Sequence, residues 1–287
     1  MLRDTWTICA VTLREGYRRR LLPALAALSL LAVLLTAWGY AQLPHLAPGG
    51  DESLSTAQIQ AIGSLLLIGV MFMFSFVLAL AAVFAAAPSL AGELESGEAL
   101  AVVARPVRRQ AILLGKWLAL AMVVTVYGIV VTACELAAVD VATGYLPPHP
   151  VETALYLDGV GLVTLTLATA LSTRVPPVTT GIVVLLLFGL AWLGGVVGGI
   201  GSAFNDPVTS QIGAVSRFLL PSDGLWRGAL FSLEPSSMLV AGSVAPQFGA
   251  FPFYADAPPS VLYLAWCAVW LVGMLLLAVV SFERRDL

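Results

Sequence analysis

Charged side chains are scarce in this chain of 287 residues. Asp, Glu, Lys and Arg make up 11% of it, whereas about 25% is usual for soluble globular domains. Hydrophobic residues make up 59%, and the mean hydropathy is +0.94. This composition excludes an ordinary water-soluble domain. The formal net charge is −3, and we expect no nucleic acid among the partners.

Cysteine and histidine are also rare. The three cysteines, Cys9, Cys134 and Cys267, are far apart and form no C-x-x-C pair, so we predict small buried apolar residues without a disulfide. His45 and His149 fall in predicted loops without metal-ligand spacing, which favours solvated histidines over a metal site. Whether either histidine has a function stays open.

Several catalytic and nucleotide-binding motifs are missing. The one Gly-Lys pair is Gly115-Lys116, and Gln110 stands where a P-loop needs its first glycine. No H-E-x-x-H or G-x-S-x-G motif occurs. We therefore predict that the chain is not an enzyme, has no catalytic or metal residues and binds no cofactor itself.

Long apolar runs are what the sequence has instead. A helix that crosses a hydrocarbon core of about 30 Å needs roughly 20 apolar residues. The runs are continuous blocks rather than alternating segments, so they predict helices and not a barrel. One run is short and contains Asp158, but the orientation of its neighbours requires a span there. We predict an all-α membrane protein with six transmembrane helices, at residues 21–43, 62–84, 111–133, 153–171, 178–200 and 261–282.

The basic residues indicate the orientation. If both termini are cytoplasmic, 12 of the 14 Lys and Arg residues fall on the cytoplasmic side, and only Arg217 and Arg227 fall outside. We therefore predict a multi-pass protein of the cell membrane with both termini in the cytoplasm.

Two segments outside the spans have their own character. Residues 1–20 predict an amphipathic helix along the inner interface, whose arginines contact membrane lipids, although a simple topogenic basic stretch is an alternative. Residues 201–260 contain seven prolines and short apolar stretches, which predict an outer cap of re-entrant or interfacial helices. In it, Ser222 or Asp223 is expected to cap a helix that begins near Gly224.

Two intramembrane features remain. The glycines at four-residue spacing predict close helix packing, within the bundle or across a dimer, with a local bend as the alternative. These helix-packing residues are Gly194, Gly195, Gly198 and Gly199. Glu135 and Asp158 are the candidates for proton transfer, but both fall near predicted outer ends, which favours ordinary helix-end carboxylates.

The segment at residues 88–110 concentrates charge. Glu93, Glu95 and Glu98 precede a short apolar stretch, Pro106 interrupts it, and arginines follow at helical spacing. The pattern predicts two short helices at an angle, the first acidic and the second basic. Plain positive-inside anchoring would explain the arginines but neither the glutamates nor the proline.

The stretch "GELESGEALAVVARPVRRQAILLGKWLA" resembles the hallmark of ABC type-2 transporter permeases. The elbow-like first helix, the span count and the outer cap are also similar to that family. The resemblance implies that residues 88–110 are a coupling helix that docks on a separate ATP-binding subunit. Glu98 stands where the family usually has threonine. The implied coupling residues are Glu93, Glu95, Gly97, Leu100, Val102, Val103, Arg105, Pro106, Arg108 and Arg109.

The resemblance also implies a function. We expect the permease subunit of an ATP-driven exporter, which works with an ABC ATPase that binds ATP and Mg²⁺ and with a second, identical or related permease chain. A proton-coupled secondary carrier and a non-transporting membrane anchor or assembly factor are the alternatives.

Overall fold

The computed structural model describes residues 2–18, 21–45, 55–89, 108–236 and 252–284. Within these ranges the chain forms helices and no strand, as an all-α membrane protein requires. The helices are α1 (Leu2–Arg18), α2 (Leu21–Gln42), the short 3₁₀ helix η1 (Leu43–His45), α3 (Thr56–Ala87), α6 (Arg109–Thr143), α7 (Pro150–Ser172), α8 (Pro177–Ala203), α9 (Pro207–Leu219), α10 (Ser222–Leu233) and α12 (Val261–Glu283).

Five helices in the described part are long and apolar enough to cross a membrane: α3, α6, α7, α8 and α12. The short predicted run with Asp158 lies in α7, one of these five. The first predicted run forms α2, in which the apolar stretch with described side chains covers only Ala26–Gln42. The count of six spans therefore stays a prediction.

Local sequence signals explain where the helices begin and end. Ser55 and Gln58 form a capping box at the start of α3, and Ser260 caps α12 by accepting a hydrogen bond from the Tyr263 N–H at 3.2 Å. α6 ends at Gly144, whose φ of 68° is the left-handed conformation that glycine adopts readily. α3 and α6 extend well beyond their predicted apolar runs, to 32 and 35 residues.

The core surrounds α7. This helix packs against α3, α6, α8, α10 and α12, and Leu157, Val160, Val163 and Leu165 in its middle are fully buried. Phe72 of α3 adds an aromatic contact to α8 and α10, because its ring lies 5.2 Å from Trp192 and 5.4 Å from Trp226. By contrast, α2 lies at the edge beside α6 and exposes large apolar side chains such as Leu31 and Trp38.

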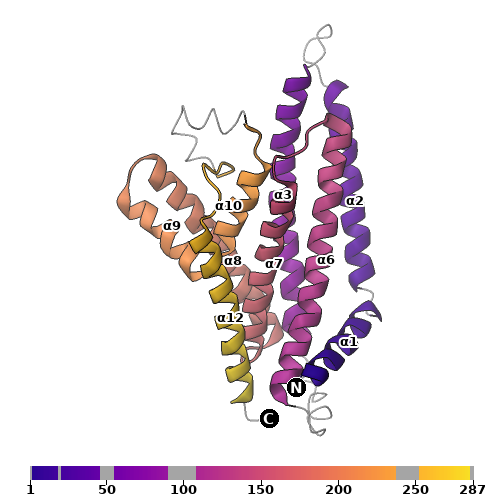
Figure 1. The fold of residues 1–287 in the computed structure, drawn as a ribbon, viewed down its shortest axis with the longest axis vertical. Coiled ribbons are helices and arrows are strands. Elements are labelled where there is room, and N and C mark those ends of the chain that lie inside the picture. Colours follow the sequence, from indigo (N-terminus) through magenta and orange to yellow (C-terminus); the bar gives the residue numbers. More distant parts are fainter. Residues whose placement is uncertain (1, 19–20, 46–54, 90–107, 237–251, 285–287) are drawn as a thin grey trace.

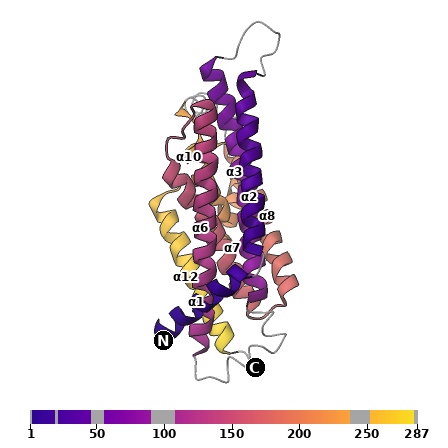
Figure 2. The ribbon, with the colours of Figure 1, turned by 90° about the vertical axis from the view of Figure 1, so that its right-hand side faces the viewer.

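The long helices run side by side, and the N-terminal helix lies across one end of them (Figure 1, Figure 2). Both ends of the chain lie at that same end of the bundle (Figure 1). We call it the terminal end, defined by α1, Ser89, the start of α6, the α7–α8 turn and the end of α12. On the other side of the bundle from α2, α9 returns alongside α8, and α10 packs on α7 (Figure 1).

Candidate functional site

The terminal end holds both attachment points of the predicted coupling segment. α3 leads to Ser89 and α6 starts after Arg108, while residues 90–107 lie outside the described residues. Glu93, Glu95, Gly97, Leu100, Val102, Val103, Arg105 and Pro106 therefore have no described position. Arg108 is exposed at the N-cap of α6, where its side chain makes no capping hydrogen bond. Arg109 donates from Nη1 to the carbonyl oxygen of Glu283 at 3.3 Å.

Polar contacts connect the two attachment points to the bundle. Lys116 is only 8% exposed, and its Nζ donates to the carbonyl oxygen of Ser89 at 2.6 Å, so it joins α6 to the end of α3. Gln110 donates from Nε2 to Oε1 of Glu283 at 2.6 Å, which joins α6 to α12. Ser281 of α12 in turn accepts from Arg174 Nε at 2.9 Å. The terminal end is thus one connected polar layer.

The first helix packs closely against the start of α6 at this end of the bundle. A Cβ at Gly115 would lie 2.7 Å from the carbonyl oxygen of Thr5 and 2.8 Å from Cβ of Ile8, so only glycine lets α1 lie this close to α6. Cys9 is buried in the same contact, whereas Trp6 is 63% exposed. The two side chains differ because α1 packs on the protein through Thr5, Ile8 and Cys9.

Basic residues gather at the terminal end. Among the arginines and the lysine whose side chains are described, only Arg217 and Arg227 lie elsewhere. The others are Arg3, Arg14, Arg108, Arg109, Lys116, Arg174 and Arg284. This clustering is the charge pattern that cytoplasmic ends of membrane helices have.

The glycine cluster of α8 faces α9 and α10 of the same chain. A Cβ at Gly198 would lie 2.5 Å from Cα of Gly213 in α9, and a Cβ at Gly194 would lie 2.5 Å from Oγ of Ser216. A Cβ at Gly195 would overlap the carboxylate of Asp223 in α10. Gly199 is buried as well. The short contacts are those of tightly packed helices, here within one chain.

Asp223 forms a buried charged cluster with two arginines. Its side chain is 2% exposed, and its Oδ2 accepts a hydrogen bond from Arg217 Nε at 2.9 Å. Arg227 places Nε 3.5 Å from the same oxygen and donates from Nη2 to the carbonyl oxygen of Gly195 at 2.8 Å. The expectation that Ser222 or Asp223 caps α10 was wrong: the N-cap is Pro221 and no side chain caps it, because Asp223 is engaged by the arginines.

Aromatic side chains of α12 cap the carboxyl end of α9. The last carbonyl groups of a helix lack partners inside that helix. Here Trp266 Nε1 donates to the carbonyl oxygen of Phe218 at 3.1 Å, and Trp270 Nε1 donates to that of Leu219 at 2.9 Å. The Tyr263 hydroxyl donates to the carbonyl oxygen of Pro221 at 3.2 Å. The helical spacing of these three aromatic residues is the sequence signal that could have identified this stripe.

The two carboxylates inside the spans are each held by a threonine. Glu135 of α6 is 2% exposed and accepts from Thr36 Oγ1 of α2 at 2.8 Å. Asp158 of α7 is 7% exposed and accepts from Thr125 Oγ1 at 3.0 Å, while its Oδ1 makes no hydrogen bond within the described part. Both are therefore buried between helices, and not solvated at helix ends as the sequence suggested.

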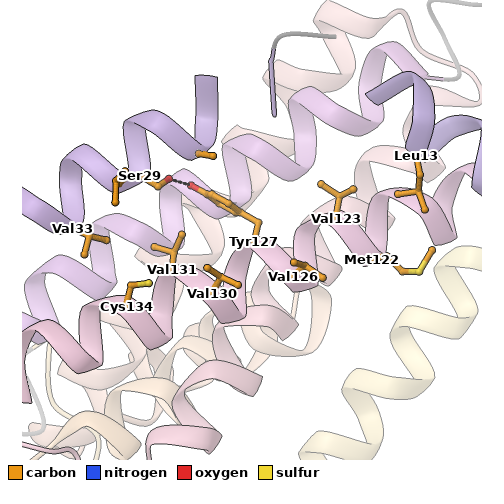
Figure 3. Close-up of a pocket in the computed structure, with 12 residues that line it drawn as sticks. Leu13, Ser29, Val33, Met122, Val123, Val126, Tyr127, Val130, Val131 and Cys134 are labelled. Carbon is orange, nitrogen blue, oxygen red and sulfur yellow. Dashed lines mark hydrogen bonds between the residues drawn. The ribbon is translucent and has the colours of Figure 1, made fainter. Parts of the chain in front are cut away.

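An apolar groove of about 640 Å³ lies between the first two helices and α6. Figure 3 shows Leu13 of α1 and Val33 of α2 on one side and residues of α6 on the other. Ser29 and Tyr127 cross it with a hydrogen bond of 2.7 Å between their hydroxyl groups. Cys134 lines this groove and is exposed, so the prediction that all three cysteines are buried was wrong for this one.

Sequence reasoning missed Glu234, which follows α10. Its side chain is fully buried, and Oε1 accepts from the N–H of Ala255 at 2.8 Å. The pKa of Glu234 is raised from 4.5 to about 8, mainly by burial; the hydrogen bond from the Ala255 N–H opposes this rise, and the nearby Asp256 adds to it. The hydroxyl of Tyr145 lies close by and donates to the Leu233 carbonyl oxygen. At neutral pH this carboxyl group is largely protonated.

This raised pKa predicts a pH dependence of stability. Because the folded state binds a proton more tightly than the unfolded chain, Glu234 contributes stability below about pH 4.5 that is lost as the pH rises through about 8. Glu234→Gln, which cannot ionise, should remove this loss. Thermal unfolding in detergent should show that the unfolding temperature of the variant rises relative to that of the wild type between pH 5 and 9. The exposed Glu152→Gln is the control, and parallel curves for Glu234→Gln and wild type would contradict the assignment.

The loop histidines show no ligand cluster. His149 Nδ1 lies 3.5 Å from Glu152 Oε1, and both side chains are about half exposed. Within the described ranges, no three His, Cys, Asp or Glu side chains come together in a way that could hold a metal ion.

Comparison with known families identifies the chain. No curated protein matches it. The family model described as "ABC-2 family transporter protein" matches residues 6–287, nearly the whole chain, and this match confirms the resemblance seen in the charged segment. The chain therefore belongs to the ABC-2 transporter family and is a multi-pass membrane permease.

Proposed function

We propose that this permease is the membrane subunit of an ATP-driven exporter, to which a separate ATP-binding subunit docks through residues 88–110. ATP and Mg²⁺ bind to that partner, and the chain itself carries out no catalysis. It crosses the cell membrane six times with both termini in the cytoplasm, and it works beside a second permease chain.

One observation carries this proposal: the ends of the docking segment are attached to the bundle and not to a loop. Ser89 is held by Lys116 at 2.6 Å, and Gln110 is held by Glu283 at 2.6 Å. A displacement of residues 90–107 by the docked subunit would therefore be transmitted to α3, α6 and α12 together. Rigid helices joined by such contacts can carry a displacement along the bundle.

The physical requirement for coupling is a difference in contacts between two states. An ATP-binding subunit shifts the permease between two arrangements only if it binds one of them better. The helix that follows the docking segment, α6, contacts α1, α3, α7 and α12, so a subunit docked at the start of α6 acts on a helix that touches all four. A carrier driven by protons, or a passive anchor, gives no role to this layer, and membership of the ABC-2 family favours neither.

The exposed arginine at the start of α6 tests the docking surface. Arg108→Glu should lower the amount of ATP-binding subunit that copurifies with the tagged permease about five- to tenfold. The new carboxylate would repel the acidic groups of the partner that the arginine is expected to face. Mild-detergent purification from the native host followed by mass spectrometry measures this amount. Arg284→Glu, an exposed arginine at the same end outside the segment, is the matched control. Equal recovery of the partner by Arg108→Glu and wild type would contradict the proposal.

A further inference from the structure

A polar cavity lies beside the first turn of α12, away from the terminal end. Its volume is about 230 Å³, and it is large enough for a lipid headgroup rather than a single water. Arg217, Arg227 and Asp256 line it together with Ser260 and Tyr263. Because α12 ends at Glu283 at the terminal end, Ser260 at its other end lies toward the opposite membrane surface.

The arginines keep binding capacity for a ligand. Arg217 uses Nε for Asp223, and Arg227 uses Nη2 for the Gly195 carbonyl oxygen. In the described part of the chain, no hydrogen bond occupies the Nη1 groups of these two side chains. Asp223 is buried behind them, whereas Asp256 is exposed on the cavity wall. The cavity thus offers guanidinium groups and a carboxylate to one ligand.

An apolar groove continues from the polar cavity. Its volume is about 650 Å³, and it shares Arg217, Ser260 and Tyr263 with the cavity. The groove then runs along α12 past Ala265 and Val269. Phe218 of α9 and Trp266 of α12 form part of its wall and stack with ring centroids 4.3 Å apart.

The surroundings of this groove are apolar and exposed. Phe218 of α9 and Leu262 and Val269 of α12 line it, and each is more than 50% exposed. In a membrane protein such a surface contacts lipid. A charged cavity that opens into an apolar groove at the end of a span matches an amphiphile with a charged head and an acyl chain.

We propose that this site binds a phospholipid with an amine-bearing zwitterionic headgroup. The phosphate contacts Arg217 and Arg227, the ammonium group contacts Asp256, and one acyl chain lies in the groove along α12. Charge of both signs in one cavity favours a zwitterion, because a purely anionic headgroup would leave Asp256 beside negative charge. This inference does not depend on ATP coupling and holds for the permease by itself.

Native mass spectrometry of the purified full-length permease tests the site. Phosphatidylethanolamine, phosphatidylglycerol and phosphatidylcholine are added separately, and retained lipid is counted. The wild type should retain phosphatidylethanolamine up to about fivefold better than phosphatidylglycerol. Asp256→Asn, an exposed position at which folding should be unaffected, should abolish or reverse that preference. Equal retention of all three lipids by the wild type, or an unchanged preference in Asp256→Asn, would overturn the proposal.

The apolar part is tested separately. Ala265→Trp fills the groove and should lower lipid retention, whereas Ala268→Trp, an exposed alanine of α12 outside the groove, should not. Inorganic phosphate at millimolar concentration should leave the lipid bound, because it cannot occupy the groove. Complete displacement of the lipid by inorganic phosphate, or equal retention by both tryptophan variants, would show that the groove holds no acyl chain.

Discussion

Gly195→Ala should prevent the permease from folding stably. The new Cβ would occupy the position of the Asp223 carboxylate, which two arginines hold in place. The helices must separate or the ion pair must break, which we expect to cost about 3 kcal/mol or more. The measurements are the yield of monodisperse protein and the unfolding temperature in detergent.

The same helix supplies the control for this prediction. Gly189 has open space around the position of a Cβ, with nothing within 4 Å. Gly189→Ala should be neutral or stabilise α8 by up to about 1 kcal/mol, because alanine favours helix more than glycine does. Similar unfolding temperatures for the two variants would mean that α8 does not pack on α10 as described.

The second large effect is expected at Asp223. Asp223→Ala removes the carboxylate that faces Arg217 and Arg227, whose side chains are 30% and 19% exposed. A buried charge left without its partner costs about 3–5 kcal/mol, and the low exposure of Arg227 places this case in that range. Asp223→Asn keeps an acceptor for Arg217 and should lose less.

A double variant separates this ion pair from general damage. Arg227→Met added to Asp223→Ala removes the stranded guanidinium, so the double variant should be more stable than Asp223→Ala alone, although the hydrogen bond to Gly195 is lost. Additive losses in the double variant, or a change below about 1 kcal/mol for Asp223→Ala, would contradict the cluster.

The sequence was most informative about the long helices. Apolar runs of about twenty residues identify spans because the bilayer thickness fixes the required length. The helix ends were less predictable. Both α3 and α6 continue past the apolar runs and include polar residues such as Gln60 and Asp140, which hydropathy alone does not assign to a helix. The distribution of arginines indicated one basic end, where the described basic side chains of α1, the first turns of α6, the α7–α8 turn and the residue after α12 gather.

Contacts between distant segments could not be read from the sequence. The spacing of Asp223 and Arg227 is that of an ion pair on one helix turn. This spacing does not predict that Gly195 of α8 lies against the carboxylate. A glycine pattern alone does not say whether its partner is another chain or, as here, α9 and α10. Glu234 lies in no recognisable sequence motif. Its burial could not be predicted, because it depends on Ala255 and Tyr145, which come from other parts of the chain.

We propose that an ATP-binding subunit contacts the segment between α3 and α6. The most direct measurement places a photoreactive amino acid at Leu100, in the predicted docking face, and compares it with one at Leu28, which is 64% exposed on α2. After irradiation in the native host, position 100 should crosslink to an ATP-binding cassette protein, and position 28 should not. Crosslinking at position 100 to lipid alone, or to the ATP-binding protein equally at both positions, would contradict the docking role.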